Sequence, residues 1–110
     1  MHKNDLVYTD HIINCIKKIR KFTKGIEKRE FERNELLQDA VIRNFEIIGE
    51  ASKKISKDFK KVYYDIPWKE ISGMRDKLIH DYLGVDIEVI WETIIQDLPF
   101  LQKELKKIND

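Results

Sequence analysis

Hydrophobic residues recur along this chain at intervals of three and four, the spacing that places them on one face of an α-helix. Four segments show the pattern: 5–23, a second that begins at 29 or 34 and ends at 56, then 67–84 and 86–108. Nowhere do apolar and polar residues alternate for long enough to predict a strand. The pattern predicts an all-α fold, an up-and-down bundle of four main helices.

Glycine and proline set the expected boundaries of the first three helices. Gly25 should follow the first helix and Gly84 should close the third, because glycine commonly ends helices. Pro67 and Trp68 open the third helix, where the missing N–H of proline is tolerated. The preceding stretch KDFKKVYYDIP, residues 57–67, is expected to be a connection with a short extra turn of helix.

The fourth helix should begin with Asp86 as its N-cap, since a carboxylate there accepts hydrogen bonds from the first turn. Pro99 should kink this helix, because proline cannot donate the hydrogen bond to Ile95. The expected core positions of the first, second and fourth helices are Tyr8, Ile12, Cys15, Ile16, Ile19 and Phe22; Leu36, Leu37, Ala40, Val41, Ile47, Ile48, Ala51 and Ile55; and Ile87, Ile90, Trp91, Ile94, Leu98, Leu101, Leu105 and Ile108.

Composition narrows the class of protein. With 110 residues, 42% hydrophobic and 37% charged, the chain is expected to form one domain over 1–110. Its 21 basic and 20 acidic residues nearly cancel, so any site for a polyanion must be local. The chain opens without a signal-peptide pattern, and no apolar run approaches the roughly 20 residues that cross a bilayer. The single cysteine, Cys15, fits a buried hydrophobe, and a reducing cytoplasm is the expected location.

The stretch RDKLIHDY, residues 75–82, breaks the pattern of the third helix. A guanidinium keeps its charge and is costly to bury alone, yet Arg75 falls inside the apolar stripe. It therefore needs a carboxylate such as Glu46 or Glu50, a partner chain, or a pocket that receives an anion. The expected members of this stripe are Trp68, Ile71, Met74, Leu78, Ile79 and Tyr82.

Tyr82 and His80 follow Arg75 on the same predicted helix. Tyr82 lies two turns later on the same face and, as a tyrosine in an apolar stripe, is more often a core residue than a site residue. His80 lies about 140° from Arg75 around the helix, so the two converge only through the reach of Arg75, a helix end near Gly84, or a second copy of the chain. Asp76, four residues before His80, either forms an ordinary surface pair with it or holds the imidazole in one tautomer.

Asn44 is a second polar residue inside an apolar stripe. A buried amide must be hydrogen-bonded, and a bridge between helices is favoured here over contact with a substrate. The sequence has no HExxH or paired cysteines for a metal, no phosphate-binding glycine loop and no GxSxG turn. An arginine, a histidine and a tyrosine without a metal suit cleavage of RNA through its own 2′-hydroxyl, in which histidine moves protons and arginine stabilises the charged phosphorane.

The motif Arg75-x4-His80-x-Tyr82, with NFEIIGEA before it and LGVDIEVIW after it, resembles the HepT family of HEPN-domain toxins. The likeness covers about Leu6 to Leu105. It implies an all-α HEPN bundle that forms a homodimer, with the motif helices of two subunits lining a cleft. It also implies a metal-independent endoribonuclease, the toxin of a toxin-antitoxin system. The implied partner is the nucleotidyltransferase antitoxin MntA, which inactivates toxins of this family by transferring AMP from ATP to the motif tyrosine.

The resemblance implies a role for each motif residue, and no cofactor. Arg75 would bind phosphate and stabilise the transition state, and His80 would transfer protons. Tyr82 would accept AMP, whose negative charge would repel an RNA backbone from the groove. Supporting roles in the site or in the fold are expected for Asp76, Asn44 and Glu50.

Two other interpretations remain open at this point. A noncatalytic HEPN module would use the same groove to bind a nucleotide or a nucleotidyltransferase partner. A helical dimer scaffold would use Arg75 in an interface ion pair. If the protein does bind RNA, a local basic rim could come from Lys77, from KKIRK at 17–21, or from SKKISKDFKK at 52–61.

Overall fold

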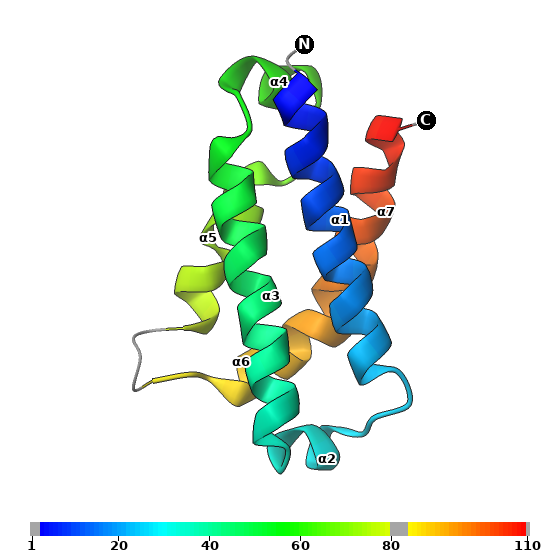
Figure 1. Cartoon of the computed structure of the whole chain (residues 1–110), viewed down its shortest axis with the longest axis vertical. Helices are drawn as coiled ribbons and strands as arrows, with labels where there is room; N and C mark the ends of the chain where they lie inside the picture. Colours follow the sequence, from blue (N-terminus) through cyan, green and yellow to red (C-terminus); the bar gives the residue numbers. More distant parts are fainter. Residues whose placement is uncertain (1–2, 80–83, 110) are drawn as a thin grey trace.

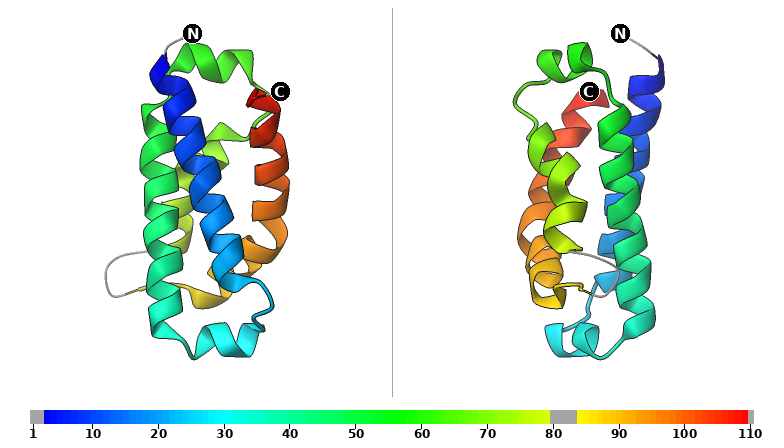
Figure 2. Two further views of the ribbon diagram at one scale, coloured as in Figure 1. Left: turned by 45° about the vertical axis from the view of Figure 1, so that its right-hand side comes forward. Right: turned by 90° about the vertical axis from the view of Figure 1, so that its left-hand side faces the viewer.

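In the computed structural model, which describes residues 3–79 and 84–109, the main helices form two layers (Figures 1 and 2). α1 and α3 lie side by side in one layer, and α5 and the α6–η1–α7 segment make the other. Successive main helices run in opposite directions, so the predicted all-α up-and-down bundle is confirmed. The elements are α1 (Lys3–Thr23), α2 (Lys28–Glu32), α3 (Glu35–Lys54), α4 (Lys57–Val62), α5 (Trp68–Leu78), α6 (Ile87–Glu92), the π-helix η1 (Thr93–Asp97), α7 (Leu98–Lys106) and the 3-10 helix η2 (Lys107–Asn109).

Polar side chains cap the starts of several helices. The side chain of Asp86 accepts a hydrogen bond from the Val89 N–H at 3.1 Å, which confirms the predicted N-cap of the fourth helix. Asn34 accepts the N–H three residues ahead of it at 3.0 Å in the same way, and it divides the predicted second helix into α2 and α3. Ser56 caps α4, which is the short extra helix expected before Pro67.

The predicted end of the third helix near Gly84 is wrong, because α5 ends at Leu78. Ile79 has the extended angles φ −124° and ψ 101°, and it forms an antiparallel bridge with Val85. The Asp86 N–H also donates to the Leu78 carbonyl at 3.3 Å. These bonds use backbone groups that a longer helix would have needed. Hydrophobic spacing cannot reveal them, because Leu78 and Ile79 are buried here and were also expected in the apolar stripe of a longer helix.

The fourth helix changes direction near the predicted position (Figure 1). The wide π-helical turn η1 precedes Pro99, which lies in the first turn of α7, where its missing N–H is tolerated. The Thr93 hydroxyl donates to the Val89 carbonyl at 2.8 Å at the start of this turn. The expected kink is therefore present as a change from α-helical to π-helical bonding just before the proline.

The core lies between the two layers and contains most of the predicted apolar positions. Two predicted members are wrong: Phe22, in the last turn of α1, is 40% exposed, and Leu36, in the first turn of α3, is 83% exposed. Among residues 3–79 and 84–109, no helix is long and apolar enough to span a membrane. The largest fully buried side chains are Phe31, Phe45, Phe59, Ile12, Ile16, Ile19, Ile48, Ile71, Leu78, Ile90, Leu98 and Leu105.

A buried carboxylate near the start of α1 joins this helix to the start of α4. Asp5 is 2% exposed and accepts hydrogen bonds from both the N–H and the hydroxyl of Ser56, each at 2.8 Å. Ser56 in turn caps α4, so α1 and α4 are joined by a polar contact that spans 51 residues of sequence. This contact fixes the segment that leads into α5.

Candidate active site

Arg75 lies near the end of α5, with its stem against α3 and its guanidinium toward solvent. A Cβ placed on Gly49 of α3 would lie 3.5 Å from the Arg75 Cβ, so the two helices approach closely at this point. The Arg75 side chain is nonetheless 44% exposed. Long basic side chains often bury their stems and keep their charge in water. The expected cost of burying the guanidinium therefore does not arise.

Among the described residues, the ion-pair partner of Arg75 is its neighbour in sequence. Its Nη1 lies 3.4 Å from Oδ1 of Asp76, whose side chain is 71% exposed. An exposed pair of this kind contributes little to stability. Within the described part of the chain, the alternative of an ion pair with Glu46 or Glu50 is wrong. The guanidinium is thus held only loosely and can exchange Asp76 for an anionic ligand.

Asn44 and Glu50, the two supporting residues expected on α3, differ in their surroundings. Asn44 is 8% exposed, and its amide nitrogen donates to the Ala40 carbonyl at 2.8 Å, one turn back in the same helix. The prediction that Asn44 bridges two helices is therefore wrong for its amide N–H, which bonds within α3. Glu50 is exposed to solvent. The polar contact that does join α3 to α5 is made by the hydroxyls of Ser52 and Ser72, 2.7 Å apart.

His80 and Tyr82 lie outside the described residues. The structure describes the residues that flank them, up to Ile79 and from Gly84 onward. α5 delivers Arg75 and ends at Leu78, and the Ile79–Val85 bridge returns the chain to the start of α6. Sequence spacing placed Tyr82 on the same helical face as Arg75, and the end of α5 at Leu78 removes the basis for that argument.

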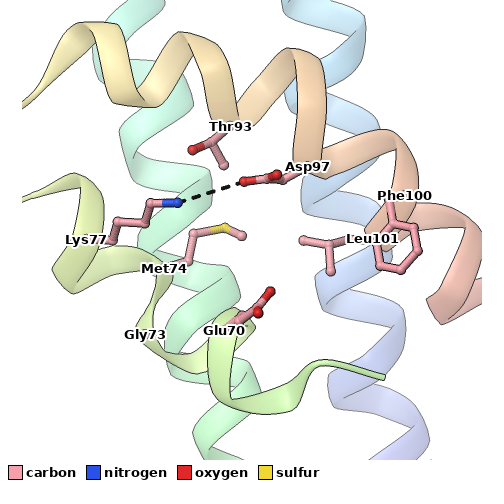
Figure 3. A pocket seen from close by; sticks show the side chains of 8 residues that line it. All are labelled: Glu70, Gly73, Met74, Lys77, Thr93, Asp97, Phe100 and Leu101. Carbon is pink, nitrogen blue, oxygen red and sulfur yellow. Dashed lines mark ion pairs between the residues drawn. The ribbon is translucent and has the colours of Figure 1, made fainter. Parts of the chain in front are cut away.

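A cavity of about 400 Å³ opens between α5 and the η1–α7 segment (Figure 3). Its charged residues are Glu70, Lys77 and Asp97, and the Lys77 Nζ lies 4.0 Å from Oδ2 of Asp97. Met74 and Leu101 form part of its apolar lining. Lys77 was one expected source of a basic rim for RNA, but its charge is offset by the two carboxylates that share the cavity. The cavity is therefore poorly suited to a phosphate group.

Two other kinds of site, a reactive thiol and a metal centre, find no support among the described residues. Cys15 is 6% exposed, and burial raises the pKa of its thiol, which favours the unreactive protonated form. Within the ranges 3–79 and 84–109, no three His, Cys, Asp or Glu side chains are grouped so that they could hold a metal ion.

Comparison with known proteins identifies the family. A family model described as HepT-like, ribonuclease HepT-like, matches residues 12–108. The chain belongs to the HepT-like ribonuclease family. A candidate RNase of Methanocaldococcus jannaschii is 50% identical to this HepT-like chain, over 94% of the chain and 79% of the relative. The probable ribonuclease HepT of Thermococcus cleftensis is 44% identical over 99% of both proteins.

A solved structure supports the same fold. The tri-AMPylated HEPN toxin of Shewanella oneidensis, solved in complex with an MNT antitoxin, superposes with a TM-score of 0.66 and covers 99% of the HepT-like chain and 98% of its own. The two sequences are 19% identical, so the match shows the HEPN fold. The expected family and fold are therefore confirmed.

Sequence reasoning missed the features of this HepT-like chain that depend on contacts between helices. Gly49 stands inside the segment NFEIIGEA, and a glycine in a helix interior is a signal of close packing. Ser52 and Ser72 gave no signal, because each reads as an ordinary small polar residue on a helix. The cavity beside α5 combines residues from α5, η1 and α7, whose meeting no local pattern predicts.

Proposed function

We propose that this protein is the toxin of a toxin-antitoxin pair, a metal-independent endoribonuclease that acts through Arg75 and His80. The observation that carries the proposal is the match to the HepT-like ribonuclease family, which extends from residue 12 to residue 108 and so includes the whole motif. The loose pairing of Arg75 with Asp76 supports it, because a phosphate can replace an exposed carboxylate at little cost.

The proposed reaction uses the 2′-hydroxyl of the RNA as its nucleophile. A bond forms between this oxygen and the adjacent phosphorus while the bond from phosphorus to the 5′-oxygen breaks. His80 accepts the proton of the 2′-hydroxyl or supplies the proton of the leaving 5′-oxygen, and a second copy of the motif across a homodimer cleft can perform the other transfer. Arg75 donates hydrogen bonds to the charged phosphorane oxygens. The products are a 2′,3′-cyclic phosphate and a 5′-hydroxyl.

Silencing is proposed to occur at Tyr82. A nucleotidyltransferase antitoxin would direct the Tyr82 hydroxyl to attack the α-phosphate of ATP, so that AMP is attached and pyrophosphate leaves. The modified tyrosine would carry negative charge close in sequence to Arg75, repelling the RNA backbone and occupying the place of the substrate. The related HEPN toxin that carries AMP and was solved with an MNT antitoxin supports this assignment of a partner.

Removing metal is expected to leave RNA cleavage unchanged. The purified protein, with intact mass confirming that Tyr82 carries no AMP, is incubated with cellular RNA in EDTA beside a His80→Ala protein prepared identically. Cleavage by the wild type alone, leaving 2′,3′-cyclic phosphate ends, is the expected result. If both proteins fail to cleave, the motif is better assigned to binding a nucleotide or a partner. Loss of cleavage that Mg²⁺ restores would overturn metal independence.

Tyr82→Phe is expected to retain RNA cleavage and to resist silencing. Phenylalanine keeps the ring but lacks the hydroxyl that would form the bond to AMP. The measurement is intact mass and RNA cleavage after incubation with ATP and a nucleotidyltransferase of the MNT class, with Tyr64→Phe as a matched control because Tyr64 is 78% exposed. AMP on the Tyr82→Phe protein, or its absence from the wild type, would remove Tyr82 from this role.

A further inference from the structure

The stretch between Asp10 and Glu27 is unusual in this chain because it contains basic residues and no acidic ones. Elsewhere acidic and basic residues are intermixed, and the net charge of the whole protein is only +1. Here the charged residues of the second half of α1, and the one that follows its end, are all basic. The basic residues are Lys17, Lys18, Arg20, Lys21 and Lys24.

Four of these cations line one groove. It lies between the second half of α1 and the η1–α7 segment, has a volume of about 670 Å³, and is lined by Lys17, Arg20, Lys21 and Lys24 on the α1 side. Three apolar residues, Ile94, Ile95 and Pro99, face them from the other side. None of the described residues that line it is acidic. We call this site the basic groove.

A buried amide holds one of the cations in place. Gln102 of α7 is 8% exposed, and its Oε1 accepts a hydrogen bond from Nη1 of Arg20. Thr23, the other polar residue of the lining, donates its hydroxyl to the Ile19 carbonyl at 2.8 Å. The acceptor of Gln102 is therefore already occupied, while the ammonium groups and the remaining guanidinium N–H groups are donors, so the basic groove favours an anion.

Asp97 lies in sequence between Ile95 and Pro99 of the basic groove, but its side chain lines the cavity on the other side of η1. Asp97 belongs to η1, but it lines the cavity beside α5 and lies 4.0 Å from Lys77 (Figure 3). The two sides of η1 thus differ in charge. The cavity on the α5 side has two carboxylates, Glu70 and Asp97, and one cation, Lys77, whereas the charged residues among the described lining of the basic groove are all cations.

The shape of the cluster fits a row of phosphates. From Lys17 to the end of α1 at Thr23 the helix advances by about 9 Å, and Lys24 follows directly, so the cations form a row and not a single point. None of the described residues that line the basic groove is aromatic, so this lining offers no ring on which a base could stack. Contacts with the backbone position a nucleic acid without reading its sequence. RNA is favoured over an acidic protein because the proposed substrate is itself a polyanion. With a net charge of only +1, the protein gives RNA no general attraction, so a local row of cations must supply it.

We propose that the basic groove binds the phosphate backbone of the substrate RNA away from the cleavage site; this proposal rests on the proposed function. α5 and the second half of α1 lie on opposite sides of α3 (Figure 1), so an RNA that reaches both must pass around the bundle or across to a second copy. The basic groove supplies affinity, and Arg75 and His80 supply the chemistry. Its loss raises KM and leaves kcat close to that of the wild type.

The test compares two triple variants that remove the same charge. The groove variant is Lys17→Gln, Lys21→Gln and Lys24→Gln, which keeps Arg20 and its bond to Gln102. The control variant is Lys53→Gln, Lys57→Gln and Lys61→Gln, three exposed lysines of the stretch SKKISKDFKK. Both are made with His80→Ala, and binding of a long single-stranded RNA is measured by fluorescence anisotropy over a range of salt concentrations. Thermal unfolding checks that both variants fold.

The groove variant is expected to bind RNA about tenfold more weakly, with the slope of log K against log salt smaller by about two, as three lost phosphate contacts predict. The control variant should change binding by less than about twofold. Equal weakening of both variants would mean that only net charge matters and would overturn the proposal. If polyglutamate displaces the RNA as well as unlabelled RNA does, the groove belongs to an acidic protein partner.

Cleavage by the same lysine variants, with His80 intact, separates this proposal from the proposed function. A wild type that cleaves RNA, with a groove variant whose KM is unchanged, would refute the basic groove and leave the nuclease in place. A wild type that cleaves nothing, with a groove variant that binds RNA more weakly, would refute the nuclease and leave the groove.

Discussion

Alanine at Arg75 or at His80 is expected to lower kcat for RNA cleavage by at least about 100-fold while the helical fold remains intact. Loss of one preorganised donor to a developing oxyanion commonly lowers kcat by about 100- to 1,000-fold, and loss of a general acid or base has an effect of similar size. The measurement is the rate of cleavage of a defined RNA at saturating concentration, together with the free energy of unfolding in urea.

The structure explains why Arg75→Ala should leave the fold intact. The Arg75 side chain is 44% exposed, and its ion pair with Asp76 lies on the surface. Exposed pairs contribute about 0–1 kcal/mol, so the free energy of unfolding should fall by less than about 1 kcal/mol. Only the stem contacts α3, near Gly49, and alanine retains the Cβ that lies closest to it.

Two further variants separate charge from geometry at this position. Arg75→Lys keeps the positive charge but loses the fork of N–H donors, so it should retain part of the activity. Asp76→Asn removes the partner of Arg75 in the surface pair and tests whether the carboxylate orients the guanidinium. A fall of more than about 2 kcal/mol in the stability of Arg75→Ala would point to a structural arginine. Dissociation of a dimer without any other loss would point to an interface ion pair.

The sequence predicted a helix boundary correctly where a single capping residue determines it. The Asp86 side chain caps α6 as expected, because an N-cap depends only on the residues of the next turn. The end of α5 could not be predicted in this way. It depends on the bridge between Ile79 and Val85 and on the hydrogen bond from Asp86 to Leu78, which are tertiary contacts. The helical wheel that placed Arg75 inside an apolar stripe also could not show that its guanidinium reaches solvent.

The candidate site was predicted by resemblance more than by physical reasoning from spacing. The motif names Arg75, His80 and Tyr82, and only Arg75 lies within the described residues. The basic groove shows the opposite case. The run KKIRK was visible as a source of positive charge, but nothing in the sequence indicated that α1 would meet η1 and α7 with Asp97 on the other side.

The stretch before Pro67 shows how a segment interpreted as a connection can hold part of the core. Phe59 of α4 is 0% exposed. Its ring centroid lies 4.8 Å from that of Tyr63 and 6.2 Å from that of Trp68, the first residue of α5. The Trp68 indole N–H donates to the Tyr63 carbonyl at 3.0 Å. This aromatic cluster therefore anchors the start of the helix that carries Arg75.

Phe59→Ala is expected to lower the free energy of unfolding by about 3–5 kcal/mol, because it removes a fully buried ring and leaves a cavity between α4 and α5. That loss is a large part of the 5–15 kcal/mol typical of a folded domain. Phe59→Leu should lose much less, since it fills most of the volume and gives up mainly the aromatic contacts. Urea unfolding monitored by circular dichroism measures both losses.

Val62→Ala provides the matched control on the same helix, because Val62 is 58% exposed and its truncation should change stability by no more than about 0.5 kcal/mol. Similar small losses at Phe59 and Val62 would show that α4 is not part of the cooperative core. Comparing Phe59→Ala with Arg75→Ala also distinguishes loss of folding from loss of a catalytic group. Phe59→Ala should reduce RNA cleavage only in proportion to the fraction of unfolded protein, whereas Arg75→Ala should reduce it in protein that is fully folded.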